Sequence, residues 1–219
     1  MFRINWKIKA LLYKIIFAFR LKKTLFFIQK NITRRATVKI NEINFYWKHH
    51  LKYLQSFNSL SVLEFGAGKS LEQNIYLSYK FDNKLSQTVI DISNMLDIEL
   101  FNDANTQISN VLKTKVKPQV KSINEIKKFY NIEYLSPYTI EKISKEDFNF
   151  DACISSTTIE HLPINELQKT FTFLKKIIKK NGIISSLIDY SDHYSHTDKK
   201  IGPLNFLQYS NDVWKKYNT

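Results

Sequence analysis

The sequence contains one cysteine, four glycines and four prolines among its 219 residues. The single cysteine, Cys153, excludes an intramolecular disulfide and a zinc cluster built from cysteines, and it fits a reducing compartment. Long uncharged apolar runs are also missing, so neither a membrane-spanning helix nor a secretory signal peptide is predicted. These absences predict a cytoplasmic protein. The scarcity of glycine makes each one informative, because glycine tolerates backbone conformations that other residues avoid.

Acidic residues are nearly absent from the N-terminal arm, residues 1–50. That arm holds 12 of the 33 Lys and Arg residues and one acid, Glu42, whereas the rest of the chain holds 21 bases and 19 acids. A nucleic-acid enzyme would carry its basic charge around the active-site face, so no nucleic-acid partner is expected. Two interpretations of the arm are open. Residues 1–35 form a basic helix on an anionic membrane surface, or they form a helix that covers the core and exposes its bases.

The rest of the chain alternates short apolar runs with stretches of helical spacing. Apolar runs at 61–65, 87–92, 131–135, 150–156 and 183–188 predict five strands. Helices are predicted from about Ser70 to Tyr79 and over 164–180, the second one stopped by Asn181 and Gly182. Alternation of this kind predicts an α/β fold with a mostly parallel, Rossmann-like sheet and right-handed crossovers.

The first predicted strand ends in Glu64-Phe65-Gly66-Ala67-Gly68, and the second ends at Asp91. Ligands of open parallel sheets sit beyond the carboxyl ends of the strands. Two glycines would let the backbone turn tightly and approach a ligand there. An acid at the end of the second strand is where a carboxylate accepts the hydroxyl protons of a ribose. The pattern therefore predicts a nucleoside-containing cofactor at this edge.

Two other nucleotide motifs fail on residue identity. Gly68-Lys69-Ser70 imitates the end of a phosphate-binding P-loop, but the first glycine of that pattern would fall on Leu63. A GxGxxG dinucleotide fingerprint would need glycine where Leu71 stands. A nicotinamide-dependent enzyme is therefore the less favoured hypothesis.

Three stretches resemble class I S-adenosylmethionine (SAM) dependent methyltransferases of the small-molecule branch. They are VLEFGAGKS (62–70), VIDIS (89–93) and FDACISSTTIEHLP (150–163). The resemblance covers roughly residues 58–215 and implies a methyltransferase domain over 51–219 with SAM as cofactor. It implies that Glu64 orients the amino-acid end of SAM and that Asp91 holds the ribose. The full set of cofactor residues so predicted is Glu64, Gly66, Ala67, Gly68, Asp91, Ile92 and Ser156. The acid that the family places after the third strand to contact adenine is replaced by Leu135, Ser136 and Pro137, and Glu133 is a weak substitute.

Three histidines are candidates for catalysis: His161, His193 and His196. Metal-dependent relatives carry ExxEH, but Thr157 stands at its first position here, so no metal is predicted with Glu160 and His161. His161 lies beside the transferred methyl group, or it caps the following loop. The segment 189–198 holds His193 and His196 and is an acceptor-binding region with a base, a polar surface loop, or an HxxH metal site.

The segment GPLNFLQYSNDVW (202–214) resembles a substrate-side segment of methyltransferases from bacterial surface-glycan gene sets. The predicted function is methyl transfer to a hydroxyl or amine of a small-molecule, glycan or lipid-linked acceptor. The alternatives are a nicotinamide-dependent Rossmann enzyme and a non-catalytic binding or scaffold protein with this fold.

The strand count predicts a sheet without the last two strands of the family. Residues 189–219 contain no pair of β-branched runs separated by a turn, and 206–217 are typical of a loop and a helix. The fifth strand would then lie at an edge with unpaired backbone groups. The N-terminal arm, the segment 190–219 or a second subunit is expected to cover it. Both a naturally short family member and a truncated reading frame fit this pattern.

Overall fold

The computed structural model describes residues 5–32 and 36–217. The chain divides into two compact units. One unit comprises residues 38–188 and is called the sheet unit here. The other combines residues 1–37 with 189–219 and is called the terminal unit. Each unit is described by itself.

The sheet unit is built on one parallel sheet in the order β3-β2-β1-β4-β5. Its strands are β1 (Leu60–Phe65), β2 (Leu85–Ile90), β3 (Ile132–Leu135), β4 (Phe150–Ser156) and β5 (Ile178–Leu187). The predicted α/β class and the five predicted strands are confirmed. Because connections between parallel strands cross over and return, the carboxyl ends of all five strands lie at one edge of the sheet.

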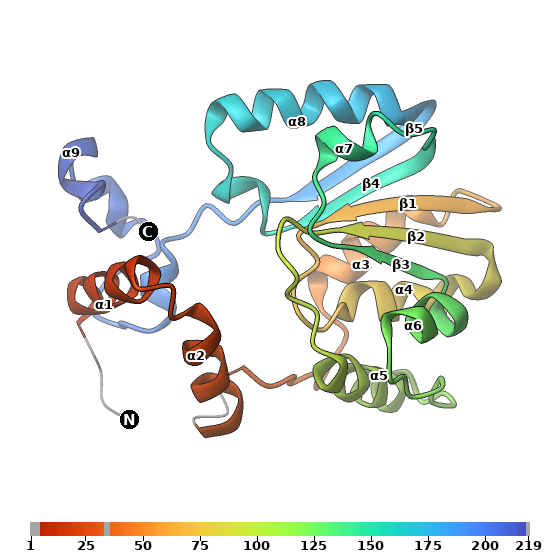
Figure 1. Cartoon of the computed structure of the whole chain (residues 1–219), viewed down its shortest axis with the longest axis horizontal. Coiled ribbons are helices and arrows are strands. Elements are labelled where there is room, and N and C mark those ends of the chain that lie inside the picture. The colour runs from red at the N-terminus through yellow and green to blue at the C-terminus, as the bar shows by residue number, and fades with distance from the viewer. Residues whose placement is uncertain (1–4, 33–35, 218–219) are drawn as a thin grey trace. The chain divides into compact units, whose positions relative to one another are not determined.

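Helices cover both faces of this sheet (Figure 1). The described helices of the unit are α3 (Phe45–Leu54), α4 (Glu72–Phe81), α5 (Ile98–Leu112), α6 (Ile123–Tyr130), α7 (Ile140–Ile143) and α8 (Ile164–Ile177), with short 3-10 turns at Asp82–Lys84 and Ile159–His161. α7 and α8 lie on one face, and α3, α4 and α5 lie on the other (Figure 1). On the α8 face, Leu174 and Ile177 pack into a buried cluster with Leu63, Cys153 and their neighbours.

The helix predicted over 164–180 ends earlier, at Ile177. The prediction relied on Asn181 and Gly182 as the stop, but residues 178–182 already belong to β5. There the register with β4 is irregular: Phe150 pairs with Ile178, whereas Ala152 pairs with Ile183. A Cβ on Gly182 would lie 2.8 Å from the carbonyl oxygen of Asp151, so the close approach of the two strands requires glycine.

The described residues that follow β5 contain helical turns and no strand. They form η4 (His193–His196), η5 (Asn205–Gln208) and α9 (Asn211–Trp214), which agrees with the loop and helix predicted over 206–217. In the described part of the sheet unit, β5 therefore pairs with β4 alone and forms an edge.

The terminal unit joins the first part of the N-terminal arm, residues 1–37, to this C-terminal segment. That part of the arm contains α1 (Trp6–Ala18), α2 (Lys22–Phe27) and a π-helical turn at Ile28–Ile32. Trp6 is 3% exposed, and its ring lies 5.0–5.7 Å from four aromatic rings, those of Tyr194, Tyr209, Trp214 and Tyr217. Its backbone N–H donates to Asp198 Oδ2 at 3.1 Å. The two ends of the chain thus share one aromatic core. Among the described helices, none has the length and apolarity needed to cross a membrane.

Candidate cofactor site at the carboxyl edge of the sheet

The loop after β1 turns on two glycines in the left-handed region, Gly66 with φ +78° and Gly68 with φ +77°. The two positions differ in their surroundings. A Cβ on Gly66 would lie 2.4 Å from Thr158 Oγ1, whereas a Cβ on Gly68 would meet nothing within 4 Å. Gly66 therefore lets the loop pack against the segment after β4. Gly68 leaves open space beside the backbone, as a ligand cradle requires.

Asp91 follows β2 directly and lies beside this loop. Phe65 and Ile90 are register partners, and Gly66 N–H donates to the carbonyl oxygen of Ile90 at 3.3 Å. Asp91 is 7% exposed, and burial raises the pKa of its carboxyl group, opposed by the backbone N–H groups of Ser93 and Ile92. Oδ1 accepts from Ser93 N–H at 3.2 Å, but Oδ2 is buried without a hydrogen-bond partner. Such an oxygen is an acceptor that a ligand hydroxyl would satisfy.

The loop after β3 closes the same edge. Tyr138 N–H donates to the carbonyl oxygen of Asp91 at 2.7 Å, which ties this loop to the end of β2. Ser136 Oγ is a second buried polar atom without a partner. Glu133, the weak substitute for an adenine-contacting acid, forms an ion pair with Lys127 instead. Ser136 was not among the predicted site residues, although a hydroxyl directly after a strand was the available signal.

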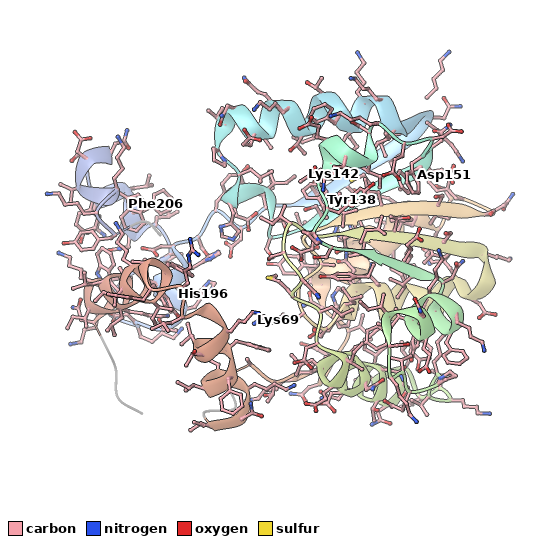
Figure 2. The ribbon with its side chains drawn as sticks, in the orientation of Figure 1. Lys69, Tyr138, Lys142, Asp151, His196 and Phe206 are labelled. Carbon is pink, nitrogen blue, oxygen red and sulfur yellow. The ribbon has the colours of Figure 1, made fainter. Side chains whose placement is uncertain are left out.

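Figure 2 shows the two ends of the sheet through labelled side chains. Lys69 in the glycine loop and Tyr138 lie towards the carboxyl edge, whereas Asp151 lies at the opposite end. Burial lowers the pKa of Lys69, an effect opposed by the charge of Asp97. Leu71, which replaces the third glycine of a dinucleotide fingerprint, is fully buried and has φ +49° at the start of α4. The chain thus keeps a left-handed turn at this position without a glycine.

Glu64 lies one residue before the end of β1 and is buried, with 2% exposure. Its Oε1 accepts from Gln73 Nε2 at 2.9 Å, and its Oε2 accepts from Asn74 Nδ2 at 2.7 Å. Burial raises the pKa of Glu64 to about 7, although both amide donors favour the charged form. The carboxylate is therefore held by the first turn of α4, with amides rather than a cation as its hydrogen-bond partners.

The segment after β4 adds a strained residue to the edge. Thr157 has φ +49°, and its N–H donates to the carbonyl oxygen of Leu187 at 2.8 Å. A left-handed β-branched residue is unusual and costs about 1–3 kcal/mol, and such strain clusters at functional sites. Thr158 Oγ1 donates to the carbonyl oxygen of Ser156 at 3.1 Å. The strained turn thus brings the end of β4 against the glycine loop.

The remaining predicted cofactor residues lie on the same edge. Ala67 is half-buried between the two glycines, Ile92 is exposed, and Ser156 is half-buried at the end of β4. The structure therefore places all seven predicted cofactor residues at the ends of three adjacent strands, β2, β1 and β4.

The three candidate catalytic histidines fall in different units. His161 is exposed on the 3-10 turn after β4, in the sheet unit. His193 and His196 belong to the terminal unit, where their rings stack at 5.5 Å. His193 Nε2 lies 3.4 Å from Asp189 Oδ2, and His196 Nε2 lies 3.3 Å from Ser191 Oγ. A carboxylate beside an imidazole orients the ring.

No protein-family model matches the chain, and no curated protein matches it. Several solved structures do. PKMT2 from Rickettsia typhi in complex with AdoHcy is 13% identical with a TM-score of 0.41, and the match covers 67% of this chain and 26% of that one. The CurJ carbon methyltransferase is 13% identical with a TM-score of 0.43, over 76% of this chain and 39% of that one. Prephenate dehydrogenase from A. aeolicus, in complex with hydroxyphenyl propionate and NAD+, is 12% identical with a TM-score of 0.33, over 66% and 39%.

This chain therefore spans well under two thirds of the length of these three proteins. Identities of 12–13% and TM-scores below 0.5 describe a distant likeness of fold. They assign neither an activity nor a ligand to this chain. The Rossmann-like arrangement follows from the sheet itself, whose strand order and parallel pairing are those of doubly wound α/β proteins.

Proposed function

We propose that the sheet unit binds SAM at its carboxyl edge and that the protein transfers the SAM methyl group to a small-molecule acceptor. The observation that carries this proposal is Asp91 Oδ2, a buried carboxylate oxygen without a partner beside the two-glycine loop. A ribose offers neighbouring hydroxyl donors for such an oxygen. The resemblance of residues 62–70, 89–93 and 150–163 to the methyltransferase motifs favours SAM over other nucleosides.

The residues of the edge fit this cofactor. Asp91 would accept hydrogen bonds from the ribose hydroxyls. The open space beside Gly68 would let the cofactor approach the backbone closely. Ser136 Oγ offers a hydroxyl where the family carries an acid. The charge of Glu64 would complement a cationic ligand. When bound, SAM supplies a methyl group on a positively charged sulfur, and in-line transfer depends mainly on positioning.

The acceptor is proposed to be a hydroxyl or amine of a small molecule, a glycan or a lipid-linked glycan, on the resemblance of residues 202–214. Removing the acceptor proton would need a base near neutral pH, and imidazole suits that task. His161, His193 and His196 remain the proposed candidates. Asp189 supports His193 most directly, because it lies 3.4 Å from the ring.

Replacing Asp91 by alanine should weaken SAM binding by about 1.5–3 kcal/mol, or roughly 10- to 150-fold, because hydrogen bonds to a charged group are lost. Calorimetry of the wild type and the variant measures this. Glu133→Ala is the matched control, since that acid on the neighbouring strand is paired with Lys127 and should leave affinity unchanged. Equal SAM affinity in Asp91→Ala and the wild type would overturn the ribose assignment.

The same titrations separate the proposal from its alternatives. Binding of SAM and of its demethylated product, without binding of NAD, supports the methyltransferase. Binding of NAD alone identifies a nicotinamide enzyme. Binding of none of the three identifies a protein that has the fold without the cofactor.

We also propose that the protein is cytoplasmic and binds an anionic membrane surface through α1. Ile8, Leu11, Leu12 and Ile15 are 56%, 60%, 44% and 44% exposed. Their spacing of three, four and seven residues places them on one face of the helix, in an exposed stripe. Buried Trp6 and Ala10 occupy the opposite face. The stripe therefore lies outside the aromatic core of the terminal unit.

The charges around the stripe favour an anionic bilayer as its occupant. Residues 5–32 hold seven Lys and Arg residues and no acid. On the helical projection, Lys7 and Lys14 flank the stripe on one side and Lys9 on the other. Their long side chains can bury their stems along apolar surface and keep the ammonium groups in the polar layer. Apolar residues bordered by cations match the boundary of acyl chains and anionic headgroups.

The double variant Leu11→Glu/Ile15→Glu should bind vesicles that contain phosphatidylserine at least tenfold more weakly than the wild type, because about 1.5 kcal/mol or more of apolar burial is lost. Co-sedimentation measures this. Ile164→Glu is the matched control, since that residue is 71% exposed on α8 in the other unit. If the wild type self-associates in the absence of vesicles and the double variant does not, the stripe binds a second copy of the chain instead of a membrane. If the double variant still binds vesicles and added salt abolishes that binding, charge alone accounts for the contact and the apolar stripe plays no part.

A further inference from the structure

A continuous chain of hydrogen bonds links Ser185, His50, half-buried Ser156 and Gln73 to Glu64. Ser185 Oγ lies 2.8 Å from His50 Nδ1, and His50 Nε2 lies 3.0 Å from Ser156 Oγ. Ser156 Oγ donates to Gln73 Oε1 at 3.0 Å, and Gln73 Nε2 donates to Glu64 Oε1 at 2.9 Å. The chain crosses β5, α3, β4, α4 and β1. It therefore joins groups from five elements of the sheet unit.

When Glu64 is ionised, its carboxylate fixes the direction of every link. An ionised carboxylate can only accept, so Gln73 must turn its NH₂ group towards Glu64 and its oxygen towards Ser156. The single proton of Ser156 then points to Gln73, which leaves the Ser156 oxygen to accept from His50 Nε2–H. A neutral imidazole carries one proton, so Nδ1 must accept from Ser185. All donors thus point towards Glu64.

The surroundings of His50 keep its ring neutral. His50 is fully buried, and desolvation, together with the charge of His49, lowers its pKa to about 4. The other titratable groups facing Glu64 are few. The Cys153 thiol on β4 has a pKa raised by burial and by the charge of Glu64, and α4 and β2 present the amides of Asn74 and Gln87. α3 therefore contributes a neutral hydrogen-bond donor, the His50 ring, to this site.

We propose that His50 is a positioning residue of the cofactor site, which orients Ser156 and Gln73 and favours the ionised form of Glu64 through this one-way chain. The inference rests on the proposed SAM site for its consequence, since Ser156 and Glu64 are two of the predicted cofactor residues. It goes beyond that site because α3 lies outside all three resembling motifs. Hydrogen-bonded chains polarise one another, so the last donor to the carboxylate is strengthened by the first.

Two ligand-free measurements on the full chain test the orientation. Nitrogen-15 NMR of the His50 ring should show one neutral tautomer, protonated at Nε2, at about pH 8 and above, where Glu64 is ionised. Carbon-13 NMR of the Glu64 carboxyl group should give a midpoint near pH 7, because burial raises the pKa of this group to about 7. A ring protonated at Nδ1, or exchanging between both tautomers, would overturn the assigned direction.

Three substitutions test the effect on Glu64. His50→Gln retains a terminal NH₂ donor near the place of Nε2 and should keep the Glu64 midpoint. His50→Leu removes the donor and should raise that midpoint by about half a pH unit or more. Ser186→Ala is the control, because Ser186 neighbours Ser185 on β5 but points to the other face of the sheet. Equal midpoints in all three variants, or equal shifts in the Gln and Leu variants, would overturn the proposal.

Folding is checked by thermal unfolding of each variant. Should His50→Leu fail to fold, Ser156→Ala breaks the same link by removing one oxygen atom and should raise the midpoint in the same direction. SAM calorimetry over the same pH range then gives the consequence: the pH at which affinity is half-maximal should follow the Glu64 midpoint upwards. Absence of SAM binding in the wild type would refute the proposed function alone, because the NMR titrations need no ligand.

Discussion

Replacing Gly66 by alanine should lower the free energy of unfolding by about 2–5 kcal/mol. The left-handed φ of +78° costs a residue with a Cβ about 1–2 kcal/mol. The new Cβ would also lie 2.4 Å and 2.5 Å from two atoms of the Thr158 side chain, and overpacking of this kind costs about 1–3 kcal/mol. Urea unfolding monitored by circular dichroism measures the loss. SAM binding should weaken with it, because the loop at the end of β1 must shift.

The chain offers a matched control for each part of this effect. Gly68→Ala has the same φ strain without the contact and should cost only about 1–2 kcal/mol. Thr158→Gly in the Gly66→Ala background removes the contact and should restore about 1–3 kcal/mol, which a double-mutant cycle isolates. Equal losses for Gly66→Ala and Gly68→Ala would show that Thr158 plays no part.

The sheet edge was predictable because each of its signals is local. The alternation of strands and helices predicts a parallel sheet, and in such a sheet strand ends share an edge. The sequence could therefore place Gly66, Gly68 and Asp91 together without knowing any contact. The predicted end of the helix that begins at residue 164 was wrong by three residues, because Lys179 and Lys180 fit a helix C-terminus. The tight pairing of these residues with β4 overrides that preference, and this pairing is not a local signal.

The contacts that complete the site were not predictable from the chain alone. Thr158 meets Gly66 from 92 residues away, and His50 reaches Ser185 from 135 residues away. No pattern marks His50, whose neighbours His49 and Leu51 give it no distinct environment in sequence. The aromatic core around Trp6 likewise depends on residues near the other end of the chain. Packing between distant segments determines which polar residues are buried together, and a single sequence contains no local signal for that packing.

Replacing Glu64 by glutamine should raise the free energy of unfolding relative to that of the wild type as pH rises, by an amount on the order of 3 kcal/mol between about pH 4.5 and pH 8. The folded-state pKa of Glu64, about 7, lies above the ordinary value of 4.5. The folded protein therefore binds the proton more tightly, so the stability from Glu64 is full below pH 4.5 and is lost as pH rises through about 7. Glutamine has no such loss.

Urea unfolding of both proteins across this range gives the difference curve. His50 acts in the opposite sense, because its pKa is lowered to about 4: its contribution is full above the ordinary value of 6.5 and is lost as pH falls through about 4. The contribution of His50 is full above pH 6.5 in both proteins, so the part of the difference curve between about pH 6.5 and pH 8 reports Glu64. High salt should change the curve little, since buried charges are weakly screened. A flat difference, or one that falls with pH, would contradict the raised pKa.

Packing alone does not explain why a buried carboxylate that lowers the stability of the fold at neutral pH is present. Charges are kept in protein interiors when a partner or a ligand compensates them, and residues that reduce stability concentrate at functional sites. The amide partners Gln73 and Asn74 satisfy the hydrogen bonds of Glu64 but do not neutralise its charge. A cationic ligand would do so, and SAM carries both a sulfonium and an ammonium group. Glu64→Gln is therefore expected to bind SAM more weakly at pH 8, although its stability relative to the wild type increases up to that pH. A variant that gains stability and keeps full SAM affinity would remove Glu64 from the site.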